Sequence, residues 1–157
     1  MSRTLLVAAF AALLAGSDAD VLDTMDALRF NAPKEKGRAE LVAGKLGKAI
    51  RFQLDKDSRS TFFTSNLRGT PAWDRAAGLS FWVKGDGTEQ FAGVQLIHDN
   101  DYAVRYDAVF PIRGSDWTRV TLAWGDFVPV LPGPKAKPLD PAGGNPPSKV
   151  SAVVTVV

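Results

Sequence analysis

The chain has no cysteine and a single histidine, His98, among its 157 residues. The absence of cysteine excludes a disulfide scaffold and a thiolate zinc site, so the fold must rest on its own hydrophobic core. No Gly-x-Ser-x-Gly elbow is present. A nucleotide-binding fingerprint is also missing, because Gln90 follows Gly85 and Gly87 where a third glycine would be needed. No convincing pair of catalytic carboxylates is evident either. We therefore predict a protein that is not an enzyme.

The charged residues are nearly balanced in sign. There are 19 Lys and Arg against 17 Asp and Glu, which gives a formal net charge of +2. The basic residues are scattered along the sequence and form no stripe of the kind that neutralises phosphates. The sequence therefore predicts no nucleic-acid partner.

The N-terminal residues 1–19 have the pattern of a signal peptide. Arg3 supplies a short positive region, residues 5–14 are apolar, and residues 17–19 are suited to cleavage before Asp20. The apolar run is shorter than the roughly 20 residues of a transmembrane helix. We predict an exported protein, secreted or periplasmic, with no membrane attachment after cleavage. The alternative is that the run is the first helix of the domain.

A period of two dominates the remainder of the chain. Leu79, Phe81 and Val83 alternate with polar or amphipathic neighbours, and similar runs follow at intervals of about 8–12 residues, separated by turn-forming clusters. The predicted strands are residues 47–54, 59–67, 79–84, 91–98, 102–112, 117–124 and 150–157, with a strand-like start at 21–30. Residues 86–87 predict a hairpin turn. We expect an all-β fold, an antiparallel β-sandwich of two sheets.

The last part of the chain combines a long loop with a final strand. Residues 130–147 contain six prolines and three glycines, which predicts a surface loop. Residues 150–157 are mostly β-branched, as in the interior of a sheet. Because the sequence ends inside this run, we predict that the domain is truncated and lacks its last strand. The alternative is a terminal strand that pairs in the middle of a sheet.

Four segments resemble the galactose-binding-like jelly-roll sandwiches. They are LSFWVKGDG at 79–87, DWTRVTLAWGDF at 116–127, VLDTMDAL at 21–28 and GKAIRFQL at 47–54. The similar families are carbohydrate-binding modules of families 11 and 30 and the complex I intermediate-associated domains, over residues 20–157. The resemblance implies a jelly roll that binds a saccharide on a concave face or at edge loops, beside a catalytic domain of a secreted enzyme. It also implies one further strand.

The candidate polar contacts lie on two neighbouring strands. Arg105 and Asp107 are two residues apart and therefore share one strand face, and Gln95 could point the same way from the preceding strand. A saccharide needs such fixed polar groups next to flat apolar surfaces. The alternative is a solvated face with a cross-strand ion pair.

Two tryptophans are the candidate stacking surfaces. Trp82 shares a strand face with two polar residues, and Trp73 lies in a loop. Tyr102, Tyr106 and other aromatics on the opposite strand faces are expected in the core. His98, next to a turn, is expected to contact saccharide or to form a hydrogen bond within the turn.

No cofactor is predicted apart from a structural calcium ion. The resemblance implies such an ion away from the saccharide, and Asp23 and Asp26 near the first strand are its candidate ligands. Residues 99–101 have suitable carboxylates but lack the rest of a calcium loop, so we interpret them as a hairpin turn.

The function predicted from the sequence is a monomeric, non-catalytic carbohydrate-binding module for a polysaccharide or oligosaccharide, covalently linked to a glycan-active enzyme. One alternative is a sandwich for protein interaction or assembly. Another is the N-terminal part of a secreted hydrolase whose catalytic domain lies beyond Val157.

Overall fold

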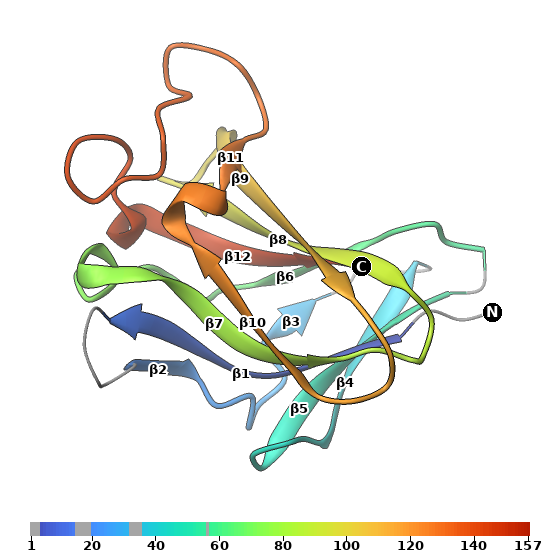
Figure 1. Ribbon diagram of the computed structural model, residues 1–157. Helices are drawn as coiled ribbons and strands as arrows, with labels where there is room; N and C mark the ends of the chain where they lie inside the picture. The colour runs from blue at the N-terminus through green and yellow to red at the C-terminus, as the bar shows by residue number, and fades with distance from the viewer. Residues whose placement is uncertain (1–3, 15–19, 32–35, 56) are drawn as a thin grey trace.

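Two antiparallel β-sheets pack face to face in the computed structural model, which describes residues 4–14, 20–31, 36–55 and 57–157 (Figure 1). In sheet A the order is β10, β7, β1, β5, β4, and β2 also pairs with β1. Its strands are Thr4–Leu14 (β1), Asp20–Asp23 (β2), Gly37–Ala43 (β4), Lys48–Leu54 (β5), Ala76–Lys84 (β7) and Thr118–Ala123 (β10).

Sheet B has the order β11, β9, β8, β12, β6, β3. Its strands are Phe30–Asn31 (β3), Phe62–Ser65 (β6), Gln90–His98 (β8), Asp101–Ile112 (β9), Val128–Pro129 (β11) and Val150–Val156 (β12). Three short 3₁₀ turns complete the fold: Trp73–Arg75 (η1), Trp124–Asp126 (η2) and Pro147–Lys149 (η3). The predicted all-β sandwich is confirmed. Among the described residues, no helix is long and apolar enough to span a membrane.

Alternation along each strand builds the core. The inner face of β7 contributes Leu79, Phe81 and Val83, all at most 2% exposed, and Phe81 packs edge-to-face against Phe110 of β9 at 5.3 Å between ring centroids. This contact joins the two sheets directly. Tyr106 is also fully buried, as predicted, whereas Tyr102 is 61% exposed and the prediction of a core position is wrong. Tyr102 lies just beyond a break in the β8–β9 register, between Ile97 and His98, so the alternation no longer applies to it.

One predicted hairpin is confirmed and another is wrong. Asp99 and Asn100, with φ of 52° and 56°, connect β8 to β9 in the same sheet, and two successive positive φ angles are typical of a type I′ turn. The turn around Asp86 instead connects β7 of sheet A to β8 of sheet B. There the Asp86 carboxylate accepts a hydrogen bond from the Thr88 amide at 3.0 Å, which stabilises the turn between the sheets.

Strand β4 is not among the strands predicted from the sequence, and its segment carries the charged residues Arg38 and Glu40. In the structure its polar side chains pair across the strands. Arg38 donates hydrogen bonds to Gln53 at 3.0 and 2.7 Å, and Glu40 accepts one from Arg51 at 3.0 Å. Polar alternation on an outer sheet face thus accompanies a regular β4–β5 hairpin.

The segment expected to form the apolar part of a signal peptide is strand β1. It pairs with β7 on one side and, on the other, with β5 through its first half and with β2 through its second half. Leu5 and Val7 are at most 1% exposed. β1 thus connects β7 to the β4–β5 hairpin. Cleavage before Asp20 stays a prediction, and residues 15–19 lie outside the described residues.

The long loop and the final strand have the predicted general character. Residues 130–146 form no strand beyond one isolated bridge between Leu139 and Asn145, and the loop extends from one end of the sandwich (Figure 1). Strand β12 lies between β8 and β6, in the interior of sheet B.

A stacked tryptophan pair closes the end of the core near η1 and η2. The rings of Trp73 and Trp124 lie 5.8 Å apart at an angle of 17°, and both residues are buried. The indole nitrogen Nε1 of Trp124 donates a hydrogen bond to the carbonyl oxygen of Ala76 at 2.7 Å, whereas Nε1 of Trp73 has no hydrogen-bond partner among the described residues.

Because only Trp124 has a hydrogen bond at Nε1, substitution by phenylalanine should affect stability differently at Trp73 and at Trp124. Replacing either tryptophan by phenylalanine removes a similar volume, but only Trp124→Phe removes a hydrogen bond. We expect Trp124→Phe to lower the free energy of unfolding by about 1 kcal/mol more than Trp73→Phe, measured by urea denaturation. Equal losses would show that the Trp124 hydrogen bond contributes nothing.

The position of β1 predicts the effect of removing residues 1–19. A chain that begins at Asp20 loses the strand between β7 and β5, together with two buried side chains worth about 1.5–3 kcal/mol each. We expect it to unfold without a cooperative transition, as followed by circular dichroism during urea titration. The signal-peptide prediction requires the opposite result, a shortened chain that unfolds cooperatively.

Candidate functional site

The outer face of sheet B holds the predicted polar residues side by side. Gln95 on β8 and Asp107 on β9 are directly opposite in the antiparallel register. Nε2 of Gln95 donates a hydrogen bond to Oδ1 of Asp107 at 2.7 Å. Gln95 is only 5% exposed, while Asp107 is half-buried. The amide therefore holds the carboxylate in a fixed orientation at the surface.

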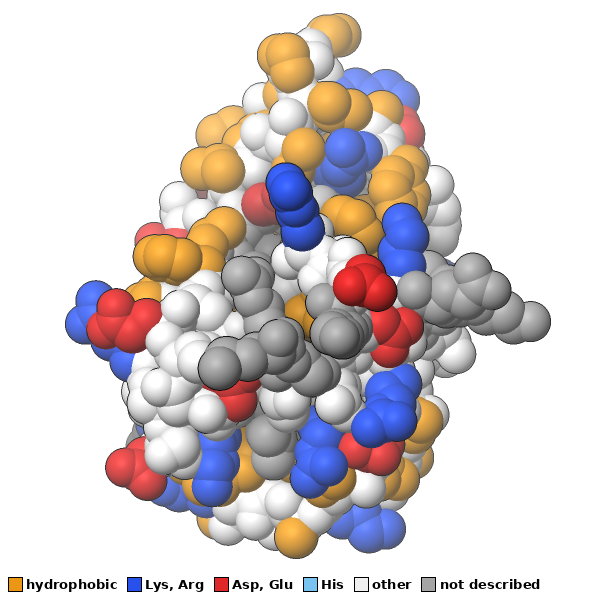
Figure 2. All heavy atoms as spheres, turned by 90° about the vertical axis from the view of Figure 1, so that its right-hand side faces the viewer, with side chains coloured by type: hydrophobic (Ala, Val, Ile, Leu, Met, Phe, Trp, Pro, Cys, Tyr) orange, Lys and Arg blue, Asp and Glu red, His pale blue; other side chains and the backbone are white. Residues whose placement is uncertain are grey.

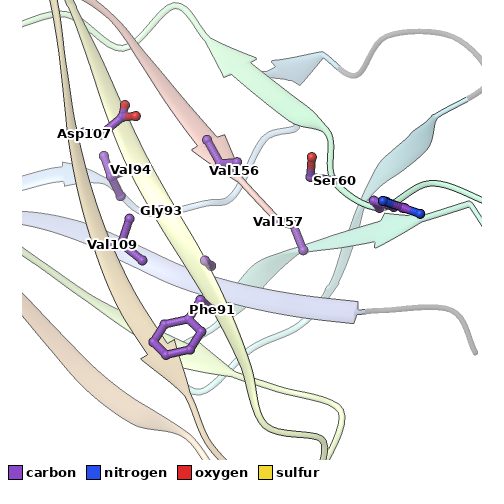
Figure 3. A pocket seen from close by; sticks show the side chains of 10 residues that line it. Ser60, Phe91, Gly93, Val94, Asp107, Val109, Val156 and Val157 are labelled. Atoms are coloured by element: carbon purple, nitrogen blue, oxygen red, sulfur yellow. The ribbon is translucent and has the colours of Figure 1, made fainter. Parts of the chain in front are cut away.

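An apolar hollow of about 260 Å³ extends from Asp107 along the same face (Figure 3). Gly93 forms its floor, and Val109 of β9 and Val156 of β12 lie on either side, each opposite Gly93 in the register. Phe91, two residues before Gly93 on β8, also lines the hollow. The site is a trough across three adjacent strands.

Two of the trough's apolar side chains are largely exposed to solvent. Phe91 is 71% exposed and Val109 is 66% exposed. On the same face Phe62 of β6 is 47% exposed and Val128, opposite Asp107 in the register, is 59% exposed. Apolar side chains gathered on one sheet face, rather than scattered singly, indicate a binding surface.

Arg59 and Ser60 line the trough from a loop outside the sheet. They precede β6, and Val157, the residue after β12, lines the trough with them; Figure 3 shows Val157 and Ser60 on the same side of the trough. The trough therefore has a polar group of each charge sign in its lining: the Asp107 carboxylate from β9 and the Arg59 guanidinium from the loop.

Arg105 shares the strand face of Asp107, as predicted, but turns away from the trough. Its Nη1 donates a hydrogen bond to the carbonyl oxygen of Tyr102 at 2.8 Å, and its guanidinium lies 5.4 Å from the centre of the Tyr102 ring. Arg105 is therefore directed along β9 toward the hairpin turn and does not line the trough.

Neither candidate stacking tryptophan lies near the trough. Trp73 is fully buried against Trp124, so it offers no surface to a ligand, and the prediction of a stacking platform in a loop is corrected. Trp82 is on the outer face of sheet A, whereas Gln95 and Asp107 are on the outer face of sheet B. The structure thus separates the predicted site onto opposite sides of the sandwich.

His98 is 2% exposed and belongs to a different part of the molecule from Asp107. It lines a hollow beneath the long loop, and this hollow shares no lining residue with the trough. Its Nε2 lies 3.1 Å from the carbonyl oxygen of Pro146, which can only accept, so Nε2 carries the proton. This geometry fits the alternative prediction that His98 forms a hydrogen bond next to the turn. The contact with Pro146 holds the start of η3 in place.

The structure describes the side chain of only one of the two candidate calcium ligands. Asp26 is exposed in the segment between β2 and β3, and the side chain of Asp23 lies outside the described residues. Among the described residues no group of three or more His, Cys, Asp or Glu could hold a metal ion. A structural calcium ion stays a prediction.

The sequence analysis did not identify Phe91, although a signal for it was present. Phe91, Gly93 and Gln95 fall on one face by strict alternation within the predicted strand 91–98. The contributions of Val156, Arg59 and Ser60 could not be read in this way, since they depend on which strands become neighbours of β8.

Comparison with known proteins adds no further assignment. No family model matches the chain, and neither the curated proteins nor the solved structures contain a significant match. The geometry of the chain itself therefore carries the functional argument.

The buried histidine predicts a specific pH dependence of stability. Burial lowers the pKa of His98 below its ordinary 6.5, and this outweighs the raising effects of the Pro146 hydrogen bond and of Asp99, while Lys149 lowers it further. Below pH 6.5 the unfolded chain binds a proton that the folded chain does not. The free energy of unfolding should therefore be highest above this pH and fall as pH decreases toward the folded-state pKa.

The measurement is the urea midpoint at about pH 7.5 and about pH 5.5, between which histidine titrates. As His98 is the only histidine, His98→Gln is a clean control, and its amide can still donate to Pro146. We expect the midpoint to change less with pH in the variant than in the wild type. The same pH dependence in both proteins would contradict a role for His98.

Proposed function

We propose that this protein is a non-catalytic carbohydrate-binding β-sandwich and that the trough on sheet B is its saccharide site. The observation that carries the proposal is an exposed aromatic ring and an immobilised carboxylate in one solvent-open apolar trough. Saccharides need both, because their rings combine apolar C–H faces with hydroxyl groups.

Phe91 and Gly93 supply the apolar surface. The Phe91 ring is 71% exposed, so it is available for contact with the C–H face of a sugar ring. Gly93 has no side chain, which leaves the space between Val109 and Val156 open down to the backbone. A flat ligand can lie across β8 without displacing a side chain.

The Gln95–Asp107 pair supplies the polar contact. Its hydrogen bond occupies one position on Oδ1 and leaves Oδ2 available to accept from a hydroxyl group. Hydrogen bonds to an ionised carboxylate are stronger than those between neutral groups, and fixing the carboxylate beforehand lowers the entropic cost of binding. Phe91 and Gln95 are four residues apart on β8, roughly 13 Å at strand spacing. That length suits an oligosaccharide.

The trough's single carboxylate supports a binding role rather than hydrolysis. Glycoside hydrolysis generally uses two acidic residues, one on each side of the scissile bond. Asp107 is the only Asp or Glu among the described residues that line the trough. The resemblance to carbohydrate-binding modules points in the same direction, and it extends the proposal to an exported protein, secreted or periplasmic, with a linked glycan-active domain.

Protein assembly is a second candidate function, favoured by the exposed apolar side chains of Phe62 and Val128 outside the trough. A protein partner would cover the whole apolar face of sheet B, whereas a saccharide would use the trough alone. Phe62 should therefore contribute to the binding of a protein partner but not to the binding of a saccharide.

Affinity electrophoresis in gels that contain neutral glucans, mannans, xylans or galactans tests the proposal. We expect at least one polysaccharide to retard the protein and Phe91→Ala to weaken that binding about tenfold, the value of roughly 1.4 kcal/mol of aromatic contact. Asp107→Asn, which removes the charge, should also weaken it.

Phe62→Ala is the matched control, because it removes an exposed phenylalanine from the same sheet face outside the trough. It should leave the retardation unchanged. No retardation by any of these polysaccharides, or equal losses in Phe91→Ala and Phe62→Ala, would overturn the assignment of the trough to saccharide.

A further inference from the structure

The outer face of sheet A gathers cationic side chains that are scattered in the sequence. The strand register and the β4–β5 turn bring five of them to this face: Arg38, Lys45, Arg51, Lys84 and Arg119. Glu40 is the only acidic residue among the described side chains on the outer face of β4, β5, β7 and β10, and exposed Asp26 lies beside the β4–β5 turn, with Oδ1 4.0 Å from a Cβ placed at Gly47. This excess is notable in a chain whose formal net charge is only +2.

The excess is local. Figure 2, which shows the side of the molecule at the right of Figure 1, has Lys and Arg side chains interspersed with Asp and Glu. Among the described side chains outside this face, basic and acidic residues are nearly equal in number. An excess of cations on one face favours the approach of an anion to that face.

Two of the five cations, Arg38 and Arg51, are engaged by side chains of the β4–β5 hairpin. Arg51 pairs with Glu40 at 3.0 Å, and Arg38 donates hydrogen bonds to Oε1 of Gln53 at 3.0 and 2.7 Å. The other three, Lys45, Lys84 and Arg119, have no carboxylate within 4.0 Å among the described residues.

Trp82 lies at the centre of these three cations. Nζ of Lys45 is 3.9 Å from the centroid of the indole, a cation–π contact. Arg119 is directly opposite Trp82 on β10, and Lys84 is two residues along β7, roughly 7 Å away. Nε of Arg119 donates to Oγ of Ser80 at 2.7 Å, which orients the guanidinium on this face and leaves its terminal nitrogens for a ligand.

The β4–β5 turn determines the position of Lys45. Gly47 has a φ of 89°, a conformation that strains other residues, and the amide of Gly44 donates to the Gly47 carbonyl at 2.8 Å. A side chain at Gly44 would collide with the backbone carbonyl of Lys48, at 2.4 Å from the added carbon. Two glycines thus produce a tight turn that directs Lys45 back over sheet A.

We propose that this face, centred on Trp82, is a second binding site and that its ligand is an acidic saccharide bearing carboxylate or sulfate groups. Lys and Arg bind such groups through charge-assisted hydrogen bonds. The half-buried Trp82 indole holds the Lys45 ammonium and adds apolar surface for a sugar ring next to it. That the anion is a saccharide rests on the proposed function; that it is an anion rests on the charge of the face alone.

Nucleic acid fits this face less well than an acidic saccharide. Nucleic-acid binding depends on a groove or stripe of cations that follows many consecutive phosphates. Here three unpaired cations surround one indole, and the neighbouring cations are engaged by Glu40 and Gln53. The charge suffices for a few acidic groups on a flat chain.

Affinity electrophoresis in polygalacturonate gels, with a neutral glucan gel as comparison, tests the proposal on the full chain. We expect polygalacturonate to retard the protein, and we expect added salt to reduce this retardation. Lys45→Ala should weaken the binding about fivefold, as expected for loss of one partly exposed ionic contact. Arg119→Gln should have a similar effect.

Lys137→Ala is the charge-matched control. Lys137 is exposed in the long loop, away from sheet A, and its substitution removes the same charge from the whole molecule. Binding within twofold of wild type is expected for it. If Lys45→Ala and Lys137→Ala weakened binding equally, the effect would come from the net charge of the protein and not from a site on sheet A, and the proposal would be overturned.

Three further outcomes would overturn the proposal: no retardation by polygalacturonate, retardation that high salt does not reduce, or stronger retardation by a single-stranded oligonucleotide that Lys45→Ala abolishes. The two sites are separable in the same gels. Suppose that the protein binds neutral glucan through Phe91 but not through Lys45, and does not bind polygalacturonate. This result would contradict the second site and leave the trough unaffected. Binding to polygalacturonate that depends on Lys45, without binding to neutral glucan, would contradict only the saccharide site in the trough on sheet B.

Discussion

The register between β8 and β9 is the constraint on which the rest of sheet B depends. The turn at Asp99 and Asn100 sets it, and the turn is fixed to the entry of β12, because the Asp99 amide donates to the Lys149 carbonyl at 3.0 Å and the Asn100 amide donates to Oγ of Ser151 at 2.9 Å. A slip by one residue would move Gln95 into the core and expose its apolar neighbours. One hairpin turn therefore positions β9 and β12 around β8 together.

The register also explains how the trough forms. Gly93 is flanked by Val109 on one strand and Val156 on the other, so the glycine floor lies between two branched side chains instead of beside another gap. The polar pair follows two residues later on the same strands. Surface chemistry of this kind comes from the outward half of an alternating pattern whose inward half builds the core.

The alternation predicted much of the fold and, in the candidate site, the polar pair Gln95 and Asp107. It identified most strands, and it placed Gln95 beside Asp107, because residues on adjacent strands of one hairpin follow directly from the turn between them. It could not predict which sheet each strand joins. Trp82 and Gln95 are only 13 positions apart, yet the chain crosses from sheet A to sheet B at the turn around Asp86. The predicted site therefore combined residues from opposite faces.

Trp73 and β1 show a second limit of sequence patterns. Trp73 lies in a loop, where exposure is the usual expectation, but its burial depends on Trp124, which is distant in sequence and packs against it at 5.8 Å. The apolar run of β1 fits a signal peptide and an interior strand equally well, since neither needs a polar face. Only the positions of β5 and β7 on its two sides distinguish the strand.

The outer faces of the two sheets carry different kinds of side chain, and the net charge of the chain does not show this difference. Among the described side chains, sheet B presents apolar groups around the Asp107 carboxylate, whereas sheet A presents Lys45, Lys84 and Arg119 around the Trp82 indole. Because each sheet uses one side for the common core, its other side is free to carry its own pattern. A chain of formal charge +2 can then combine an apolar trough on one sheet with a face on the other sheet where the described cations outnumber the acids.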